Sequence, residues 1–377
     1  EEGYSAGEIA VVYRTNAQSR VLEDVLVRQG VAYQVIGGPR FYERAEIKDA
    51  IAYLQVLDNP YDAVSLMRIA NRPRRGIGDT SVARLVTYAD GQGISLWEAT
   101  AHAEEAGLAA ASARAVRGFR SAMESLMAAA TDSSVADLVE AVLDRTGYLE
   151  ALEAERTIEA RGRIENLEEL VGVAREYDAS AAEPSLSGFL QEISLYSDQD
   201  ALRGPDDGEG GQVTLMTLHT AKGLEFRAVF VIGMEEGVFP HMRSIEENNL
   251  EEERRLCYVG MTRAKERLTL THAMRRNLFG RSEANLPSRF LDELPHLGVE
   301  RERLRPASWS DYGAPARRGV APREDVPDLS TGDAVRHSTL GTGIVTRIEP
   351  GGVVTVRFED GSERRLMLEY APLERVR

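Results

Sequence analysis

Two segments carry side chains that could bind a charged ligand. Residues 219–226 read HTAKGLEF and place a histidine, a lysine, a glycine and a glutamate directly after the apolar run of residues 213–218. Residues 254–264 read RRLCYVGMTRA and contribute three arginines. Guanidinium groups are suited to bidentate contacts with phosphate oxygens. Charged groups gathered in this way are typical of a ligand site, because a core does not require them.

Strands are needed to position these segments. The β-branched runs at residues 213–218 and 228–234 predict two buried strands of a parallel sheet. Ligands of open α/β sheets bind at the carboxyl ends of the strands, which is where residues 219–226 fall. Near the start of the chain, residues 8–14 predict another strand, which ends in Tyr13 and Arg14.

Helices alternate with the first strands. Asn16 is expected to cap a helix that Gly30 ends, residues 31–36 predict a second strand, and residues 43–57 predict a longer helix. Another helix is expected over residues 62–70. This β-α-β-α order with short connections predicts an α/β sandwich.

The middle of the chain has a different composition. Residues 101–200 are rich in alanine and glutamate, and they have helical periodicity without a convincing strand. The clearest amphipathic helices are expected over residues 133–146, 161–177 and 186–196. A run rich in Asp, Gly and Glu, residues 198–211, then precedes the return of the sheet. We therefore expect an all-α domain inserted into the α/β domain.

The last third of the chain predicts three further parts. After a helix over residues 246–264 and a strand over residues 267–273, residues 274–282 look like an arginine-rich hairpin tip that carries the apolar Leu278 and Phe279. A last helix is expected over residues 286–294. A disordered linker and a small SH3-like β-barrel of short strands should follow. The expected boundaries are residues 1–103 and 209–294 for the α/β domain, 104–208 for the insertion, 295–328 for the linker and 329–377 for the barrel.

Composition limits the possible functions. The chain has 377 residues, of which 43% are hydrophobic and 28% charged, as in globular proteins. No apolar run approaches the roughly 20 residues that cross a bilayer, and the first residues do not have the pattern of a signal peptide. The single cysteine excludes an internal disulfide framework and a cysteine-rich zinc site. The six histidines are scattered, so no metal site is predicted, and a reducing cytoplasm is expected.

The charge distribution is uneven. A net charge of −16 by itself argues against nucleic acid as a ligand. Only three residues are lysines, however, and nine basic residues gather in one segment. These are Arg254, Arg255, Arg263, Lys265, Arg267, Arg275, Arg276, Arg281 and Arg289.

Residues 71–79 form a second basic segment, NRPRRGIGD. Arg75 precedes Gly76 and Gly78, and Asp79 or Thr80 is expected to cap the next helix. Glycines ahead of a helix expose backbone N–H groups that can bind phosphate. An ordinary solvated turn would have a similar sequence.

Several longer motifs resemble one family. Residues 10–20 (AVVYRTNAQSR) resemble motif IV of superfamily 1 DNA helicases of the UvrD/PcrA/Rep type, and residues 37–49 resemble its extension. Residues 213–226 resemble motif V, and residues 251–264 resemble motif VI. The resemblance covers the C-terminal half of such helicases. It implies a RecA-like domain (2A), the helical insertion 2B, and a C-terminal Tudor-like domain.

The resemblance also implies roles at an ATP site. Tyr13 would stack on the adenine, and Arg14 would reach the γ-phosphate. Gly223 and Glu225 would contact the nucleotide, with the carboxylate bonded to the ribose. Arg263 would act as an arginine finger. ATP would bind with Mg²⁺, whose ligands are expected on a separate N-terminal lobe (1A/1B).

Contacts with DNA and other partners follow from the same resemblance. Thr217, His219 and Lys222 match positions on or near the single strand, and Phe279 matches the tip of the separation pin. Single-stranded and forked DNA are therefore the expected partners, and Arg75, Gly76 and Gly78 are further candidate contacts. The Tudor-like domain would bind proteins such as RNA polymerase or repair proteins. The expected location is the bacterial cytoplasm, at the nucleoid.

One motif of a complete motor is absent from the sequence. None of the three lysines follows a glycine, so the chain lacks the phosphate loop G-x-x-x-x-G-K-[ST]. The isolated chain is therefore expected neither to hydrolyse ATP nor to unwind DNA.

Plainer interpretations stay open beside the helicase lobe. The chain could be a non-catalytic module that binds DNA and protein, or an acidic scaffold without DNA affinity. Residue by residue, Glu225 could pair with Lys222, and Arg254 and Arg255 could pair with Glu251–Glu253.

Overall fold

The structure is a computed structural model. It describes residues 3–130, 133–202, 211–278, 281–295, 298–302, 329–337, 341–349, 353–358, 363–367 and 373–375. The chain divides into two compact units, Glu1–Glu302 and Arg303–Arg377, and each is described by itself.

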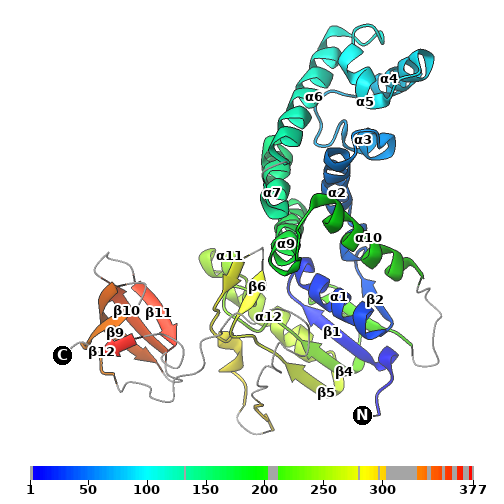
Figure 1. Cartoon of the computed structure of the whole chain (residues 1–377). Coiled ribbons are helices and arrows are strands. Elements are labelled where there is room, and N and C mark those ends of the chain that lie inside the picture. Colours follow the sequence, from blue (N-terminus) through cyan, green and yellow to red (C-terminus); the bar gives the residue numbers. More distant parts are fainter. Residues whose placement is uncertain are drawn as a thin grey trace. The chain divides into compact units, whose positions relative to one another are not determined.

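A parallel five-stranded sheet forms the base of the first unit (Figure 1). Its strands are β1 (Ile9–Tyr13), β2 (Tyr33–Ile36), β3 (Val213–Thr217), β4 (Phe226–Val231) and β5 (Ala264–Leu270), in the order β2-β3-β1-β4-β5. β1 therefore lies between β3 and β4, with Ala10 opposite both Thr214 and Val229. The predicted parallel sheet is confirmed, and it is assembled from segments about two hundred residues apart.

Alternation along β1 supplies two cores, one on each face of the sheet. Ala10 and Val12 join Met216, Val229 and Val231 in one cluster, against which Leu256 and Cys257 of α12 (Leu250–Met261) pack. Tyr13 joins Val27, Tyr33 and Leu215 in the other cluster. Successive side chains of a strand point to opposite faces, so one short strand serves both cores.

Helix α1 (Ser19–Gln29) ends as expected, but it begins differently. Gly30 closes it in the left-handed region, with φ +73°. Asn16 does not cap the helix, because it opens a 3-10 turn, η2 (Asn16–Gln18). The side-chain oxygen of Gln18 stabilises this turn, because it accepts hydrogen bonds from the backbone N–H groups of Arg14 (2.9 Å) and Thr15 (3.0 Å).

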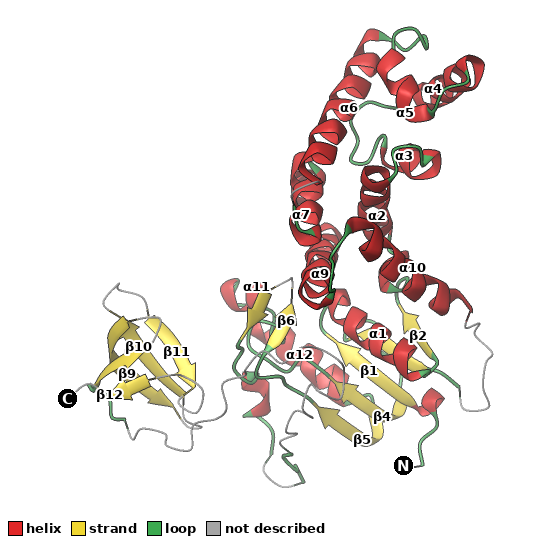
Figure 2. Cartoon of the chain, in the orientation of Figure 1, coloured by secondary structure: helices red, strands yellow, loops and turns green. Residues whose placement is uncertain are grey.

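The helical part of the chain is shown in red in Figure 2. Its described buried side chains form one hydrophobic cluster. Its helices are α2 (Ala45–Asp58), α3 (Ala63–Ile69), α4 (Asp79–Gln92), α5 (Leu96–Ala99), α6 (Ala110–Ala130), α7 (Val135–Arg145), α8 (Tyr148–Glu155), α9 (Ile158–Ser180) and α10 (Leu186–Leu202). Buried residues from Phe41 to Ile193 belong to the cluster. Ala103 and Leu108 both belong to this core, and the start of the insertion at residue 104 stays a prediction. Helices α2–α5 pack against later helices rather than against the sheet.

The segment after β4 differs from the sequence expectation at its end. It contains α11 (Met242–Glu246), α12, and a hairpin of β6 (Arg276–Leu278) and β7 (Arg281–Glu283). The helix expected over residues 286–294 is only a 3-10 turn, η5 (Arg289–Leu291). Pro287 instead bridges to Glu235, and Ser288 caps the short turn through Phe290 N.

The second unit contains a five-stranded antiparallel sheet. Its strands are β8 (Ala334–His337), β9 (Gly341–Glu349), β10 (Val353–Phe358), β11 (Glu363–Met367) and β12 (Leu373–Arg375), in the order β11-β10-β9-β8-β12. Val335, Val345, Val354, Val356 and Phe358 form its small core. Closure of this sheet into a barrel stays a prediction, and the expected linker, apart from residues 295 and 298–302, lies outside the described residues.

Candidate functional site

The carboxyl edge of the parallel sheet brings the two predicted segments together. Tyr13 at the end of β1 lies opposite Thr217 at the end of β3, and Leu218 N donates to the Tyr13 carbonyl at 2.8 Å. Arg14 and His219 therefore leave the sheet side by side. Parallel strands of a sheet present their carboxyl ends at one edge, which places ligand-binding loops there.

Arg14 is held by Glu253 in the first turn of α12. Its Nε lies 3.1 Å from Oε1 and 3.0 Å from Oε2, and its Nη2 lies 2.8 Å from Oε1. The Arg14 side chain is 19% exposed and the Glu253 side chain 3%. Such a fork-to-carboxylate pair fixes the plane of a guanidinium group. Within the described part of the chain, no hydrogen bond occupies Arg14 Nη1.

Glu253 is itself held in place from two further directions. The backbone N–H of His241 donates to Oε2 at 3.1 Å, and Ser244 Oγ donates to Oε1 at 3.0 Å. Burial raises the pKa of Glu253, but the hydrogen bonds and charge of Arg14 and the two other donors outweigh it, so the pKa lies below its usual value. The group is therefore a carboxylate at neutral pH.

Arg263 follows the other end of the same helix. It donates through Nε to the Val259 carbonyl (2.9 Å), through Nη1 to the Leu224 carbonyl (3.1 Å), and through Nη2 to Thr262 Oγ1 (3.0 Å). No carboxylate pairs with it among the described residues. A guanidinium group that is oriented by neutral oxygens retains its charge for an anionic ligand.

The loop after β3 is exposed and carries Lys222, Gly223 and Glu225. The possible pair of Glu225 with Lys222 is not formed, because Glu225 Oε2 lies 3.5 Å from Lys265 Nζ instead. Gly223 has φ +88°, a conformation that favours glycine at this turn. The carboxylate of Glu225 can therefore accept a hydrogen bond from a hydroxyl group of a ligand if its exposed ion pair with Lys265 is broken.

The first part of this loop is braced against the Gly37-Gly38 turn. Thr217 Oγ1 and Thr220 Oγ1 lie 2.9 Å apart, within hydrogen-bonding distance. A Cβ atom at Gly37 would lie 2.8 Å from Thr220 Oγ1. The motif IV extension therefore contacts motif V through a glycine that no larger residue could replace without displacement.

His219 is exposed next to Arg14 and Glu253. Desolvation of its ring and the positive charge of Arg14 lower its pKa, and the nearby carboxylates of Glu253 and Glu252 only partly offset this. The imidazole is therefore neutral at pH 7, and it can donate or accept one hydrogen bond with a ligand.

Tyr13 does not have the exposure that its expected role requires. Its side chain is fully buried in the cluster with Val27 and Tyr33, and desolvation raises the pKa of its hydroxyl group. Stacking on an adenine requires an accessible ring face, so the adenine role of Tyr13 stays a prediction that would require its ring to become accessible. Alternation along β1 turns Tyr13 toward α1, where it packs with Val27, whereas Arg14 lies at the edge of the sheet.

The second basic segment lies elsewhere. Residues 71–79 connect α3 and α4 at the end of the helical part farthest from the sheet (Figure 1). Gly76 and Gly78 are exposed, and Gly78 rather than Asp79 or Thr80 is the N-cap of α4. Arg75 is engaged internally, since Nη2 donates to Tyr53 Oη (2.6 Å) and to the Arg72 carbonyl (2.8 Å). Phe279 lies outside the described residues.

Glu253 is the residue that the sequence did not single out. The expected pairing within α12 is formed by its neighbours, Arg254 with Glu251 and Arg255 with Glu252. Glu253 alone turns inward, toward Arg14. Its position three residues after the first apolar residue of the helix, Leu250, was the available signal, because that spacing places it on the buried face.

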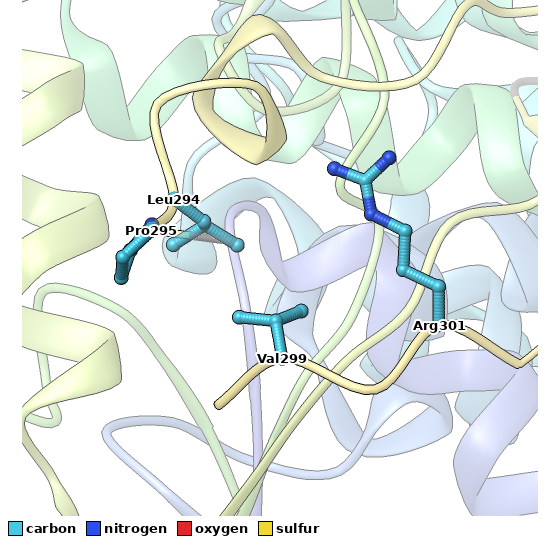
Figure 3. Close-up of a pocket in the computed structure, with 4 residues that line it drawn as sticks. All are labelled: Leu294, Pro295, Val299 and Arg301. Carbon is cyan, nitrogen blue, oxygen red and sulfur yellow. The ribbon is translucent and has the colours of Figure 1, made fainter. Parts of the chain in front are cut away.

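One hollow of the first unit is lined by residues other than those of this edge. A hollow of about 360 Å³ is lined by Leu294, Pro295, Val299 and Arg301 (Figure 3), and it contains none of the predicted site residues. Within the described ranges, no group of three or more His, Cys, Asp or Glu side chains could hold a metal ion. Nor does any described helix have the length and apolar character to cross a membrane.

A parallel sheet that gathers arginines and a polar loop at one edge fits the RecA-like class of α/β domains. Residues 1–275 match the family model of the UvrD-like helicase C-terminal domain, which is most of the chain. The chain belongs to this family, and the resemblance seen in its motifs is thereby confirmed.

Curated relatives are ATP-dependent DNA helicases named PcrA. The chain is 41% identical over 386 residues to the protein of Bacillus subtilis and 40% identical over 387 residues to that of Staphylococcus epidermidis. It is 39% identical over 386 residues to that of Staphylococcus aureus. Each match covers 98% of this chain and 52% of the relative, so the chain spans about half the length of the curated relatives it matches.

Proposed function

We propose that this chain is the C-terminal motor lobe of an ATP-dependent DNA helicase that moves 3′→5′ and acts in DNA repair. The observation that carries the proposal is that one helix positions two arginines. Glu253 in the first turn of α12 grips Arg14, and Arg263 follows the last turn, anchored to the loop that carries Glu225. A non-catalytic module that only binds DNA and protein would not need two oriented guanidinium groups at one sheet edge.

The two arginines suit the terminal phosphate of ATP. Phosphoryl transfer spreads negative charge over the transferring oxygens, and preorganised guanidinium groups stabilise that charge. In our proposal Arg14 presents its Nη1 side and Arg263 its unpaired N–H groups to the γ-phosphate. Glu225, beside Gly223, accepts a hydrogen bond from the ribose. The phosphate loop and the Mg²⁺ ligands come from an N-terminal 1A/1B lobe.

The DNA track begins beside the nucleotide. Thr217 ends β3, and His219 and Lys222 lie in the loop that follows and that carries Glu225 at its end. A shift of this loop on hydrolysis would therefore reach the single strand directly. Phe279 would stack at the duplex junction. The exposed backbone at Gly76 and Gly78 would contact duplex DNA at the far end of the helical part, with Arg75 supporting that turn from inside.

Partners and location follow from the same proposal. The C-terminal antiparallel sheet is proposed to be a Tudor-like module for RNA polymerase or repair proteins, and the protein would act in the bacterial cytoplasm, at the nucleoid. These assignments rest on the helicase family and on the small separate core of that sheet.

Hydrolysis assays on two forms of the protein test the proposal. The full-length protein should show DNA-stimulated ATP hydrolysis and unwind a 3′-tailed duplex, whereas the isolated 377-residue chain should do neither. Turnover by the isolated chain would refute the division of the site between two lobes. Failure of the full-length protein to hydrolyse ATP would refute the motor role.

A DNA- and protein-binding adaptor is the second candidate, because the chain has no phosphate loop of its own. The Arg263→Ala variant separates the two. An adaptor would keep full activity in its biological complex without this guanidinium group, whereas the motor lobe would not.

A further inference from the structure

The ion pair between Arg14 and Glu253 is unusual among the described ion pairs of α12. Arg254 and Arg255 pair with Glu251 and Glu252 on exposed surface, and exposed pairs contribute little. Glu253 is 3% exposed and pairs with a residue 239 positions away in the chain. A buried carboxylate needs several donors. Among the described residues, Glu253 has three, namely Arg14, His241 N and Ser244 Oγ.

The pair leaves one side of the guanidinium group unused. Glu253 takes the Nε and Nη2 side of Arg14, at 3.0 and 2.8 Å, while Nη1 has no hydrogen bond within the described residues. A guanidinium group has five N–H donors in a rigid plane, so holding one side fixes the direction of the other.

Glu253 does not depend on Arg14 for its own position. Its hydrogen bonds to His241 N and Ser244 Oγ anchor it to residues 241–244, just before α12. His241 in turn places its ring Nε2 3.4 Å from Glu165 of α9, in the helical part. The carboxylate is thus a fixed reference point against which Arg14 is aligned.

We propose that Glu253 is the positioning residue of Arg14, and that it keeps the Nη1 side of this guanidinium group directed at a nucleoside triphosphate's terminal phosphate. This inference rests on the proposed function. Glu253 itself does not touch the nucleotide. Its effect should therefore appear in turnover rather than in nucleotide affinity, and it should vanish when Arg14 is absent.

The test uses the full-length protein with the substitutions Glu253→Gln, Arg14→Ala and both together. Glu253→Gln keeps the shape but removes the charge, so we expect kcat for ATP to fall about tenfold, less than the roughly 10²–10³-fold loss when a donor to the reacting group is removed. The KM for ATP and the affinity for ADP should change less than twofold. Adding Glu253→Gln to Arg14→Ala should lower kcat no further, since the two act as one unit.

Matched controls make the result decisive. Glu252→Gln changes the adjacent residue, whose partner Arg255 is exposed, and it should leave kcat unchanged. Glu253→Asp keeps the charge and should restore part of the loss seen with Glu253→Gln. An unchanged kcat in Glu253→Gln, or a further loss in the double variant, would overturn the inference. If Arg14→Ala and Arg263→Ala both retain full turnover, the proposed function fails instead.

Discussion

Arg263 Nη1 donates a hydrogen bond to the Leu224 carbonyl oxygen at 3.1 Å. This contact joins the end of motif VI to the loop of motif V. Phe226 N, the first residue of β4, also donates to the Arg263 carbonyl at 2.9 Å, so the two segments are tied in both directions. The arginine is therefore oriented by the backbone that carries Glu225.

The Arg263→Ala variant tests whether this guanidinium group acts in ATP hydrolysis. Among the described residues the guanidinium group donates to uncharged oxygens, so its loss should lower the free energy of unfolding by about 1–3 kcal/mol. If it stabilises the transferring phosphate, kcat of the full-length protein should fall about 10²–10³-fold. Steady-state hydrolysis and denaturant unfolding measure the two effects. Arg255→Ala, which removes an exposed arginine of the same helix, should change neither.

Gly37→Ala tests the contact between motif V and the turn before it. Gly37 has φ +93°, and the new Cβ would lie 2.8 Å from Thr220 Oγ1. Backbone strain and displacement of Thr220 should together lower the free energy of unfolding by about 1–3 kcal/mol. Gly38→Ala is the control, because nothing lies within 4 Å of its Cβ and its φ is not positive. Equal stability of the two variants would contradict the contact.

Glu235→Gln tests how the hairpin is held. Glu235 is fully buried and accepts hydrogen bonds from Ala273 N (2.6 Å), Arg276 Nε (2.6 Å) and Arg276 Nη2 (2.7 Å). Loss of its charge should lower the free energy of unfolding by about 2–3 kcal/mol and speed amide exchange in β6 and β7. Glu236→Gln provides the comparison. Its ion pair with the 40% exposed Arg289 should contribute less than about 1 kcal/mol. Unchanged amide exchange in β6 and β7 of the Glu235→Gln variant would show that Glu235 does not hold the hairpin.

Asp24 should give the stability a measurable pH dependence. It lies beside Arg20, which also binds Glu169 of α9 at 2.8 Å. Burial outweighs the charge of Arg20 and raises the pKa of Asp24 from 3.8 to about 6. Because the folded-state value is the higher one, the stability contributed by this carboxyl group is fully present below pH 3.8 and lost as the pH rises through about 6.

Asp24→Asn checks the sign of this effect. The amide cannot ionise, so the variant should gain stability relative to the parent protein as the pH rises from about 4 to 7. Denaturant unfolding at several pH values measures the difference. Parallel pH profiles for the two proteins would show that Asp24 is not the group responsible.

The sequence by itself determined the elements and the candidate edge. Three β-branched runs predicted strands with polar ends: those before Arg14 and His219 and the one after Glu225. The order of the motifs identified the family. Local periodicity and short links are sufficient for this, because they act between residues close in the chain. Gly30 ended its helix as expected for the same reason.

Tertiary packing decided which side chains face the edge and what holds them. Tyr13 and Arg14 are neighbours, yet Tyr13 is buried against α1 and Arg14 is partly exposed at the edge, because successive side chains point in opposite directions. The charge pattern of α12 suggested that Arg254 and Arg255 pair with Glu251–Glu253, but only the fold could bring Glu253 to Arg14 across 239 residues. Buried residues from Phe41 onward share one core with the later helices, because packing between residues distant in the chain depends on the fold and not on local composition.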